Sequence, residues 1–486
     1  MDEADERFRM EITGRWTYRF AKATAALCFL FLVFFQVLGG NPFPYSDDWG
    51  FVPYAIGVEP VSWNWLWSQH VDHRIPLQKL FQVLLLRAGL FDFRVLLLAN
   101  AVFAYLATRL LLRAVRSCRG YAVTGDLLFP IVLMNPGFGP FVWGFQLQFM
   151  SSVLLTLCVL AFLLGGAANR TGPTWIAAAG CLVALAFCGM NGAVLSGLIA
   201  LPMLIYLQAV KFPSGRVNAR LASAFLFTAL AAVVWIFSSW RPSDAAGVAA
   251  DIGFVETARA VVKNWFLLIS PRGWRLPPFA PRLYYLLNGM LYISAMALVV
   301  KRLWIDRNVP ERTAQGPLIL ASVMAAALAL LLSIAVGRAA YWSPGLELHY
   351  GYLAVILPLA SWVILSSELR RMAAAAVGIL LLIVYGSAYL ENAKASVAWT
   401  SGDQRGKIAQ ICTDIGSGIS IDTFVDRHIR HFFYVDSEEC RRWLKEGVLM
   451  LKGAEVEPYR RFKDVDLRPQ SRQSPPSPPP GNGEGF

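Results

Sequence analysis

The sequence predicts an all-α polytopic membrane protein with about eleven transmembrane helices. Hydrophobic residues make up 56% of the 486 positions. Many of them form segments of about 18 or more residues with almost no charge, the length that crosses a hydrocarbon core of about 30 Å. Lys and Arg gather at alternate ends of these segments, as expected for cytoplasmic loops. This distribution excludes a large soluble protein.

The net charge of +12 belongs to the membrane region. Before Glu391 there are 30 Lys and Arg against 18 Asp and Glu, whereas from Glu391 onward each group numbers 14. The basic excess therefore reports topology, and no nucleic-acid partner is expected.

The first helix, residues 20–38, follows a basic N-terminal stretch, 1–19, that the positive-inside rule assigns to the cytoplasm. The apolar run has no A-x-A-like cleavage site and is long enough to span, so a retained helix is expected. The loop 39–93 then lies outside. Within it, residues 76–90 carry Lys79 and Arg87 at helical spacing, which predicts an interfacial helix.

The following segments alternate across the bilayer. The run 175–208 is too long for one crossing, and Met190-Asn191-Gly192 divides it in two. The other predicted spans are 94–112, 121–134, 141–164, 221–240, 284–300, 317–336, 350–365 and 373–390. The span 121–134 is short and contains Asp126 and Pro130, which neighbouring helices can shield. A second outer loop, 241–283, contains a candidate interfacial segment at 254–269. Nineteen Lys and Arg fall on the inner side of this arrangement.

The C-terminal region, 391–468, has mixed charge and short apolar runs, which predicts a small outer domain or an extended appendage. Cys412 and Cys440 share this region and could pair if it faces an oxidising compartment. From 469 to 486, Pro, Ser, Gln and Gly dominate, and disorder is expected.

The first candidate for chemistry is the acidic pair Asp47-Asp48, directly after the first helix. A carboxylate beside another carboxylate has a raised proton affinity, which suits it to accept a proton from a hydroxyl group as general base. The simpler interpretation of the dipeptide alone is a solvated turn, in which Asp47 caps a short helix at Trp49.

A second candidate, His70-Val71-Asp72-His73-Arg74, lies in the same loop. It offers the donors, the arginine fork and the nitrogen and oxygen ligands that a phosphate group or a divalent cation needs. Asp48 and His73 are the candidate metal ligands, and no other cofactor is expected. The alternative is that this cluster caps the helix beginning near Pro76. The nearby Trp49, Trp63, Trp65 and Trp67 are expected in the interfacial aromatic belt, with stacking on sugar rings as the alternative.

The order of these features resembles the GT-C class of integral-membrane glycosyltransferases, which use polyprenyl-phosphate-linked sugars and include dolichyl-phosphate-mannose mannosyltransferases. The resemblance covers residues 15–391 in layout. It rests on helix one, a large outer loop with an acidic pair near its start, and an interfacial helix before helix two. The motif from Ser46 to Trp49, the His-x-Asp-His-Arg cluster and the motif from Trp143 to Phe149 look like those of a recurrent bacterial group.

The resemblance implies that the acidic pair supplies the general base, with Asp47 as the first match and Asp48 as a supporting carboxylate or metal ligand. Which of the two is the base stays open at this point. It also implies that Trp143, Gln146 and Gln148 line the site, although such glutamines ordinarily make hydrogen bonds between helices.

The resemblance further implies a phosphate-binding arginine near the outer end of a late helix, often followed by an Arg-Tyr pair. Arg338 matches the first element or merely snorkels at the interface. The pair reads His349-Tyr350 here, and His349 can replace the arginine only as a cation or a neutral donor.

The expected function is transfer of a hexosyl or pentosyl group from a polyprenyl phosphate to an envelope lipid, polysaccharide or protein, with inversion. The reaction is expected on the periplasmic face of the bacterial cytoplasmic membrane. Arg74, Arg338 and the histidines are the candidates to stabilise the leaving phosphate. The alternatives are a transporter of lipid-linked glycans and a non-catalytic scaffold of an envelope complex.

Overall fold

The computed structural model describes residues 3–70, 73–164, 172–209, 216–241, 280–306, 315–338 and 350–462, together with Val255, Thr257, Ala258 and Val262. Within these residues every regular element is a helix, and the β-type pairing is a single bridge between His70 and His73. The predicted all-α class is therefore confirmed. The segment 254–269, predicted to be interfacial, and the tail 469–486 lie largely or wholly outside the described residues.

Nine helices among the described residues are long and apolar enough to cross a membrane. They are α1 (Glu3–Gly39), α5 (Arg94–Arg119), α7 (Leu147–Leu164), α9 (Met190–Ala209), α10 (Arg216–Ser238), α12 (Ala280–Asp306), α13 (Gln315–Arg338), the tract of α14 (Tyr350–Ala354) and α15 (Ile356–Glu368), and α16 (Arg371–Trp399). Two shorter apolar segments, η2 (Thr124–Leu127) with α6 (Leu128–Leu133), and α8 (Gly172–Ala186), coincide with the other predicted spans. The chain is an integral membrane protein.

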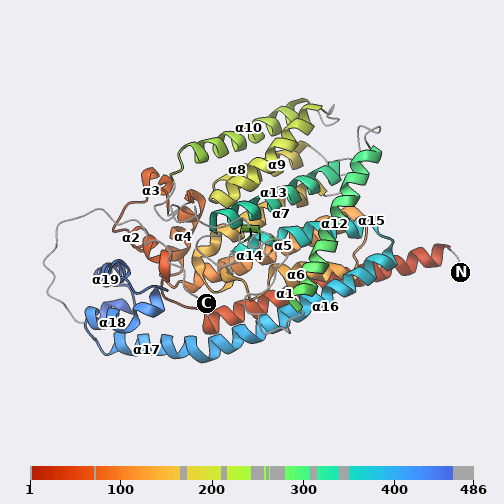
Figure 1. Ribbon diagram of the computed structural model, residues 1–486. Coiled ribbons are helices and arrows are strands. Elements are labelled where there is room, and N and C mark those ends of the chain that lie inside the picture. The colour runs from red at the N-terminus through yellow and green to blue at the C-terminus, as the bar shows by residue number, and fades with distance from the viewer. Residues whose placement is uncertain are drawn as a thin grey trace.

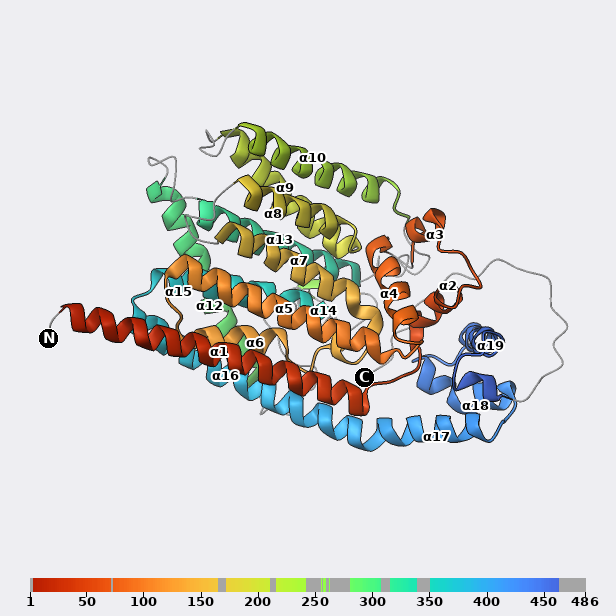
Figure 2. The same cartoon turned by 180° about the vertical axis from the view of Figure 1, so that it is seen from behind.

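The long helices form a bundle whose two ends differ (Figure 1). Figure 2 shows the same arrangement from behind, with α1 and α16 along one edge and α10, packed on α8 and α9, along the other. One end carries the short helices between α1 and α5 and the C-terminal helices, whereas the N-terminus lies at the opposite end. The helices at the first end are α2 (Val52–Ala55), α3 (Trp63–Trp67), α4 (Pro76–Ala88), α17 (Arg405–Gly416), α18 (Ile421–Phe432) and α19 (Glu438–Gly453).

The N-terminal end of the bundle is rich in cations that lie on aromatic rings. The Arg116 guanidinium is 4.3 Å from the centre of the Tyr18 ring, and that of Arg371 is 3.9 Å from the Tyr121 ring. Arg116 and Arg371, two of the basic residues that predict the inner side of the membrane, therefore lie at this end of the structure.

Asp126, the charged residue in the short predicted span, is buried and paired. Both of its carboxylate oxygens accept from Arg119 at 2.6 Å, and one accepts from the indole of Trp362 at 3.2 Å. The Arg119 and Asp126 side chains are 2% and 3% exposed. Because removing one partner of a buried pair leaves an uncompensated charge, this contact fixes the start of η2.

The connection between α6 and α7 is buried although most of it is irregular. It contains two single 3-10 turns, η3 (Gly139–Phe141) and η4 (Gly144–Gln146). Side-chain amides satisfy its carbonyls: Asn100 donates to Pro140 at 2.7 Å, Gln82 donates to Gly144 at 3.3 Å, and Gln78 donates to Phe145. Non-helical backbone is tolerated inside a membrane protein when other protein groups supply its hydrogen bonds.

The last predicted span does not end at Leu390. From α16 the helix continues through the π-helical turn η8 (Thr400–Gln404) into α17, giving a continuous helical stretch of 46 residues, Arg371–Gly416. One helix therefore joins the bundle to the C-terminal helices.

Candidate functional site

The acidic pair lies in the turn η1 (Ser46–Phe51), immediately after the chain leaves α1. The Asp48 amide donates to the Tyr45 carbonyl at 3.0 Å, and the Asp48 carboxylate accepts from the Tyr45 amide at 3.2 Å. The turn is therefore closed by Asp48. The expectation that Asp47 caps a short helix is wrong. The carboxylate that accepts from the amide preceding the turn belongs to Asp48, and the amide is that of Tyr45.

The two carboxyl groups have different environments. Asp48 is 3% exposed. Burial raises the pKa of Asp48 well above its usual range, the hydrogen bond from the Tyr45 amide opposes this rise, and the charge of Asp47 adds to it. This environment favours the neutral form of Asp48, because a buried carboxylate loses its hydration. Asp47 instead has a side chain that is 19% exposed.

His70 faces Asp47 across the site. Its Nε2 atom lies 3.7 Å from Oδ1 of Asp47. This distance is too long for a hydrogen bond, but a small shift of either side chain would form one. The imidazole packs near the rings of Phe51 and Phe145, at centroid distances of 6.1 and 5.1 Å. These contacts orient the ring toward the acidic turn.

A β-type bridge holds His70 opposite His73. The His70 amide donates to the His73 carbonyl at 2.7 Å, and the reverse bond is 2.8 Å. Asp72 lies outside the described residues. Of the predicted cluster, His70 is therefore the residue that faces the acidic pair.

Arg74 and Lys79 bind backbone carbonyls. Arg74 donates to Trp67 and Ser239, and its guanidinium lies 5.4 Å from the centre of the Trp67 ring. Lys79 donates to the carbonyls of Trp65 and Ser68, both at 2.7 Å. These bonds fasten the C-terminal end of α3. The alternative that the cluster caps the helix beginning near Pro76 is wrong, because the start of α4 has no side-chain cap.

Burial lowers the pKa of Lys79 to about 7, and the nearby positive charge of Arg74 lowers it further. Burial also lowers the pKa of Arg74, with a contribution from Arg241. Lys79, Arg74 and Arg241 therefore lie close enough for their charges to influence one another.

Trp143 links the segment after α6 to the acidic turn. Its indole nitrogen donates to the Tyr45 carbonyl at 3.2 Å, and its ring meets the Tyr45 ring edge-on at 5.6 Å. Gln146 follows within the same segment and is 1% exposed. The structure therefore places Trp143 against Tyr45 and near Asp48, at the start of the acidic turn.

Gln146 and Gln148 each have a buried side-chain oxygen with no hydrogen-bond partner among the described residues. Such an acceptor is costly to leave unsatisfied, and a hydroxyl group of a ligand would satisfy it. The Gln148 oxygen is directed at Gly189, where a Cβ atom would lie 3.0 Å from it. Gly189 also has a φ of +90°, a conformation that suits glycine.

The predicted phosphate group is only partly described. Tyr350 is buried in α14, and its ring lies 5.4 Å from Phe149, the residue after Gln148. Arg338 ends α13, but its side chain and the whole of His349 lie outside the described residues. Their roles stay predictions.

The aromatic-belt expectation is wrong for Trp49, which is 4% exposed. Trp65 and Trp67 are also engaged, because each stacks at 3.9 Å on another ring, Tyr54 and Trp235 respectively. Trp63 is 60% exposed and is the one of the four whose ring is largely open. Contacts with other aromatic rings therefore hold Trp65 and Trp67 in place.

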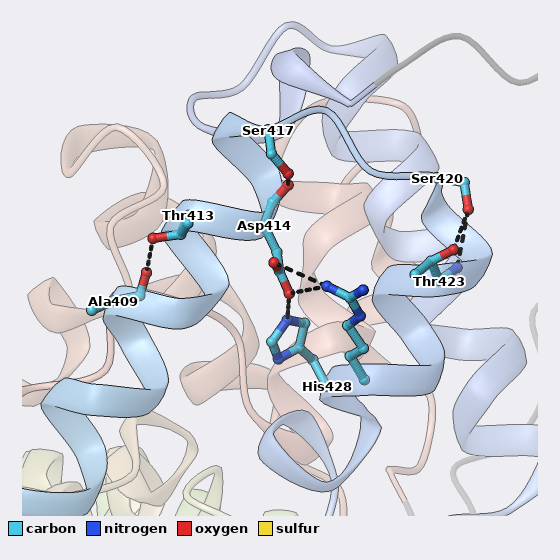
Figure 3. A network of polar contacts seen from close by, with 8 residues as sticks. Ala409, Thr413, Asp414, Ser417, Ser420, Thr423 and His428 are labelled. Atoms are coloured by element: carbon cyan, nitrogen blue, oxygen red, sulfur yellow. Dashed lines mark hydrogen bonds and ion pairs between the residues drawn. The ribbon is translucent and has the colours of Figure 1, made fainter.

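The C-terminal helices, which sequence reasoning left without a role, pack on the acidic turn. Their apolar residues form one cluster with Phe43, Trp49 and Phe51. Figure 3 shows the polar contact that joins α17 to α18, in which Asp414 and His428 approach to 2.9 Å. The hydrogen bond from His428 lowers the pKa of Asp414, and Arg427 lowers it further. Cys412 and Cys440 are both free, so the disulfide considered from the sequence is not formed.

Among the described residues there is no group of three or more His, Cys, Asp or Glu side chains that could hold a metal ion. Asp48 and His73 therefore lack a complete ligand set within this part of the chain. No family model, curated protein or solved structure matches the sequence.

Proposed function

We propose that this protein is a membrane glycosyltransferase that moves a sugar from a polyprenyl phosphate to a hydroxyl group of an envelope acceptor. The observation that carries the proposal is the pair of unlike carboxyl groups in η1. Asp48 is buried and closes the turn, whereas Asp47 is partly exposed beside His70. Neighbouring carboxyl groups in unlike environments can take different acid and base roles in enzymes.

In the proposed reaction the acceptor hydroxyl gives its proton to Asp47. The acceptor oxygen forms a bond to the anomeric carbon, and the bond from that carbon to the phosphate oxygen breaks on the opposite side. The electron pair leaves on the polyprenyl phosphate, and the anomeric configuration inverts. A positioned base of this kind typically contributes about 10²–10⁴-fold to the rate.

The other residues support substrate binding in this proposal. The unpaired amide oxygens of Gln146 and Gln148 accept hydrogen bonds from sugar hydroxyls. The leaving phosphate needs cations, for which Arg338 and the cations near Arg74 are candidates. Arg74 itself would first release the carbonyl of Trp67 or Ser239.

The position of the site suits a lipid-linked donor. The acidic turn begins a few residues after the membrane helix α1 ends, so the lipid tail can stay in the bilayer while the sugar phosphate reaches Asp47. We place this face in the periplasm, because the basic residues gather at the other end of the bundle.

The test uses purified protein in lipid vesicles, with polyprenyl phosphates that carry radiolabelled hexoses or pentoses and an envelope fraction as acceptor. We expect label to move from the lipid-soluble donor into the acceptor fraction. Label that stays on the donor but crosses to the other leaflet would indicate a transporter. Absence of both transfer and movement with every donor would favour a scaffold.

A further inference from the structure

We propose that the C-terminal helices α18 and α19 position the proposed general base, with Trp49 as the residue that connects them to the acidic turn. This inference rests on the proposed function for its consequence in catalysis, but its structural part can be tested separately. Gly447 is the key positioning residue, because its missing side chain makes room for the Trp49 ring.

Trp49 directly follows Asp48, so any shift of its ring is transmitted to the acidic turn. The Trp49 ring is 5.6 Å from the ring of Phe432 at the end of α18, in an edge-on arrangement. Phe43, on the other side of the turn, contacts Phe432 at 6.1 Å and Tyr459 at 6.1 Å. Both flanks of the acidic turn are therefore held by C-terminal residues.

Gly447 of α19 lies directly against the Trp49 ring. A Cβ atom at this position would be 2.4 Å from Cε3 and 2.6 Å from Cζ3 of Trp49. Real carbon atoms do not approach so closely, and the ring cannot swing away freely because Phe432 lies beside it. Gly447 has an ordinary helical backbone, so packing rather than conformation explains why a glycine fits here.

Polar contacts hold the C-terminal helices together and join them to the membrane helices. Besides the contact between Asp414 and His428, Arg441 of α19 bonds Asp436 at 2.6 Å. The Ser437 side chain accepts from the Cys440 amide at 3.2 Å and caps the start of α19. Through α17 and η8 these helices continue into α16, and Arg405 donates to the carbonyl of Leu38 at the end of α1 at 3.3 Å. The C-terminal helices are thus tied to the membrane helices.

The first test compares Gly447→Ala with Gly453→Ala, a matched control in the same helix where a Cβ atom would meet nothing within 4 Å. The position of the turn is read from the rate at which a charged thiol reagent modifies Asp47→Cys, after the exposed Cys118 and Cys412 are replaced by serine. We expect Gly447→Ala to change this rate and Gly453→Ala to leave it unchanged. Equal rates in the two backgrounds would overturn the inference.

A second change tests whether the ring of Trp49 is the connection. Trp49→Phe removes the ring atoms nearest Gly447, so its combination with Gly447→Ala is expected to return the modification rate toward that of the Gly453→Ala control. If Gly447→Ala fails to fold, Phe432→Leu is used in its place. This change removes the ring beside Trp49 and is expected to change the rate at which the thiol reagent modifies Asp47→Cys. No change with Phe432→Leu in a folded protein would also count against the inference.

The catalytic consequence is measured in parallel on chains that retain Asp47. A displacement of about 1 Å can cost about 100-fold in rate, so Gly447→Ala should lower kcat by about 10- to 100-fold with a smaller effect on KM, and Gly453→Ala should not. If the thiol modification rate responds as expected but no variant transfers sugar, the positioning stands and the proposed function fails.

Discussion

Asp47 and Asp48 are neighbours in sequence but differ in burial, hydrogen bonding and access. The sequence predicts an acidic pair and leaves open which member is the base. The structure separates them, because Asp48 is buried and binds the Tyr45 amide while Asp47 is partly exposed near His70. Which carboxyl group turns inward depends on the path of the turn and on its neighbour Trp143, and neither is visible in a dipeptide.

Several other residues could not be placed from the sequence for the same reason. Arg74 has the chemistry of a phosphate ligand, yet it binds the carbonyl of Trp67 in α3 and that of Ser239, the residue after α10. Trp49 has the chemistry of an interfacial residue, yet C-terminal side chains cover it. Residue type limits what a side chain can do, but the partner is set by chain segments far away in sequence.

His431 gives a prediction about acid stability at the level of one residue. Burial lowers the pKa of His431 to about 4 from its ordinary 6.5, and the charges of Lys407 and His428 add to this effect. Because the unfolded chain binds the proton more readily, the folded C-terminal helices keep their full stability above about pH 6.5 and lose it as the pH falls toward about 4.

We therefore expect His431→Gln to reduce the difference between melting temperatures measured at pH 7.5 and pH 5. Thermal unfolding of the full chain in detergent, followed by tryptophan fluorescence, provides the measurement. If the melting temperature of the variant falls as much between pH 7.5 and pH 5 as that of the unchanged protein, another group causes the loss of stability in acid.

At the scale of helices, the spans were predictable because long uncharged segments leave few alternatives to a membrane helix. The structure has a helix at each predicted span in the described residues. The sequence did not reveal that the short segment after α5 would lead into a buried irregular connection, whose carbonyls are satisfied by Gln78, Gln82 and Asn100. Such bonds join residues roughly 40 to 70 positions apart and leave no local periodic signal.

The contact of α16 with η2 gives a prediction at this scale. A Cβ atom on Gly378 would lie 2.7 Å from the Cα atom of Gly125 and 3.1 Å from the Trp362 ring. Since the obstacle is backbone, Gly378→Ala should destabilise the protein by about 1–3 kcal/mol. A Cβ atom on Gly386, in the same helix, would meet nothing within 4 Å. Gly386→Ala should therefore not destabilise the protein.

Melting temperatures of the two variants in the same detergent are the measurement. Equal melting temperatures for Gly378→Ala and Gly386→Ala would contradict the close contact between α16 and η2.

At the scale of the whole molecule, the acidic turn and the C-terminal helices lie at one end of the bundle and the basic helix ends lie at the other. Charge bias predicts this separation from sequence alone. The packing of α18 and α19 on the turn was not predictable, because an amphipathic helix shows that it has a buried face but not what covers it.

The two exposed cysteines, Cys118 and Cys412, provide a test of how the protein is oriented across the membrane. Cys118 is near the end of α5 at the basic end of the bundle, and Cys412 lies in α17. In intact cells a membrane-impermeant maleimide should label Cys412, and Cys118 should react only after permeabilisation. Single Cys→Ser variants identify each site, and labelling of Cys118 in intact cells would reverse the topology.

The central claim is that Asp47 takes the proton from the acceptor, and replacement of the two carboxyl groups tests it most directly. The measurement is sugar transfer from a radiolabelled polyprenyl phosphate by Asp47→Asn and Asp48→Asn at equal membrane expression. Loss of the base should lower kcat of Asp47→Asn by about 10²–10⁴-fold, whereas Asp48→Asn keeps a neutral group that can still accept from Tyr45 and should lose less. Full transfer by Asp47→Asn, or a larger loss in Asp48→Asn, would contradict the account.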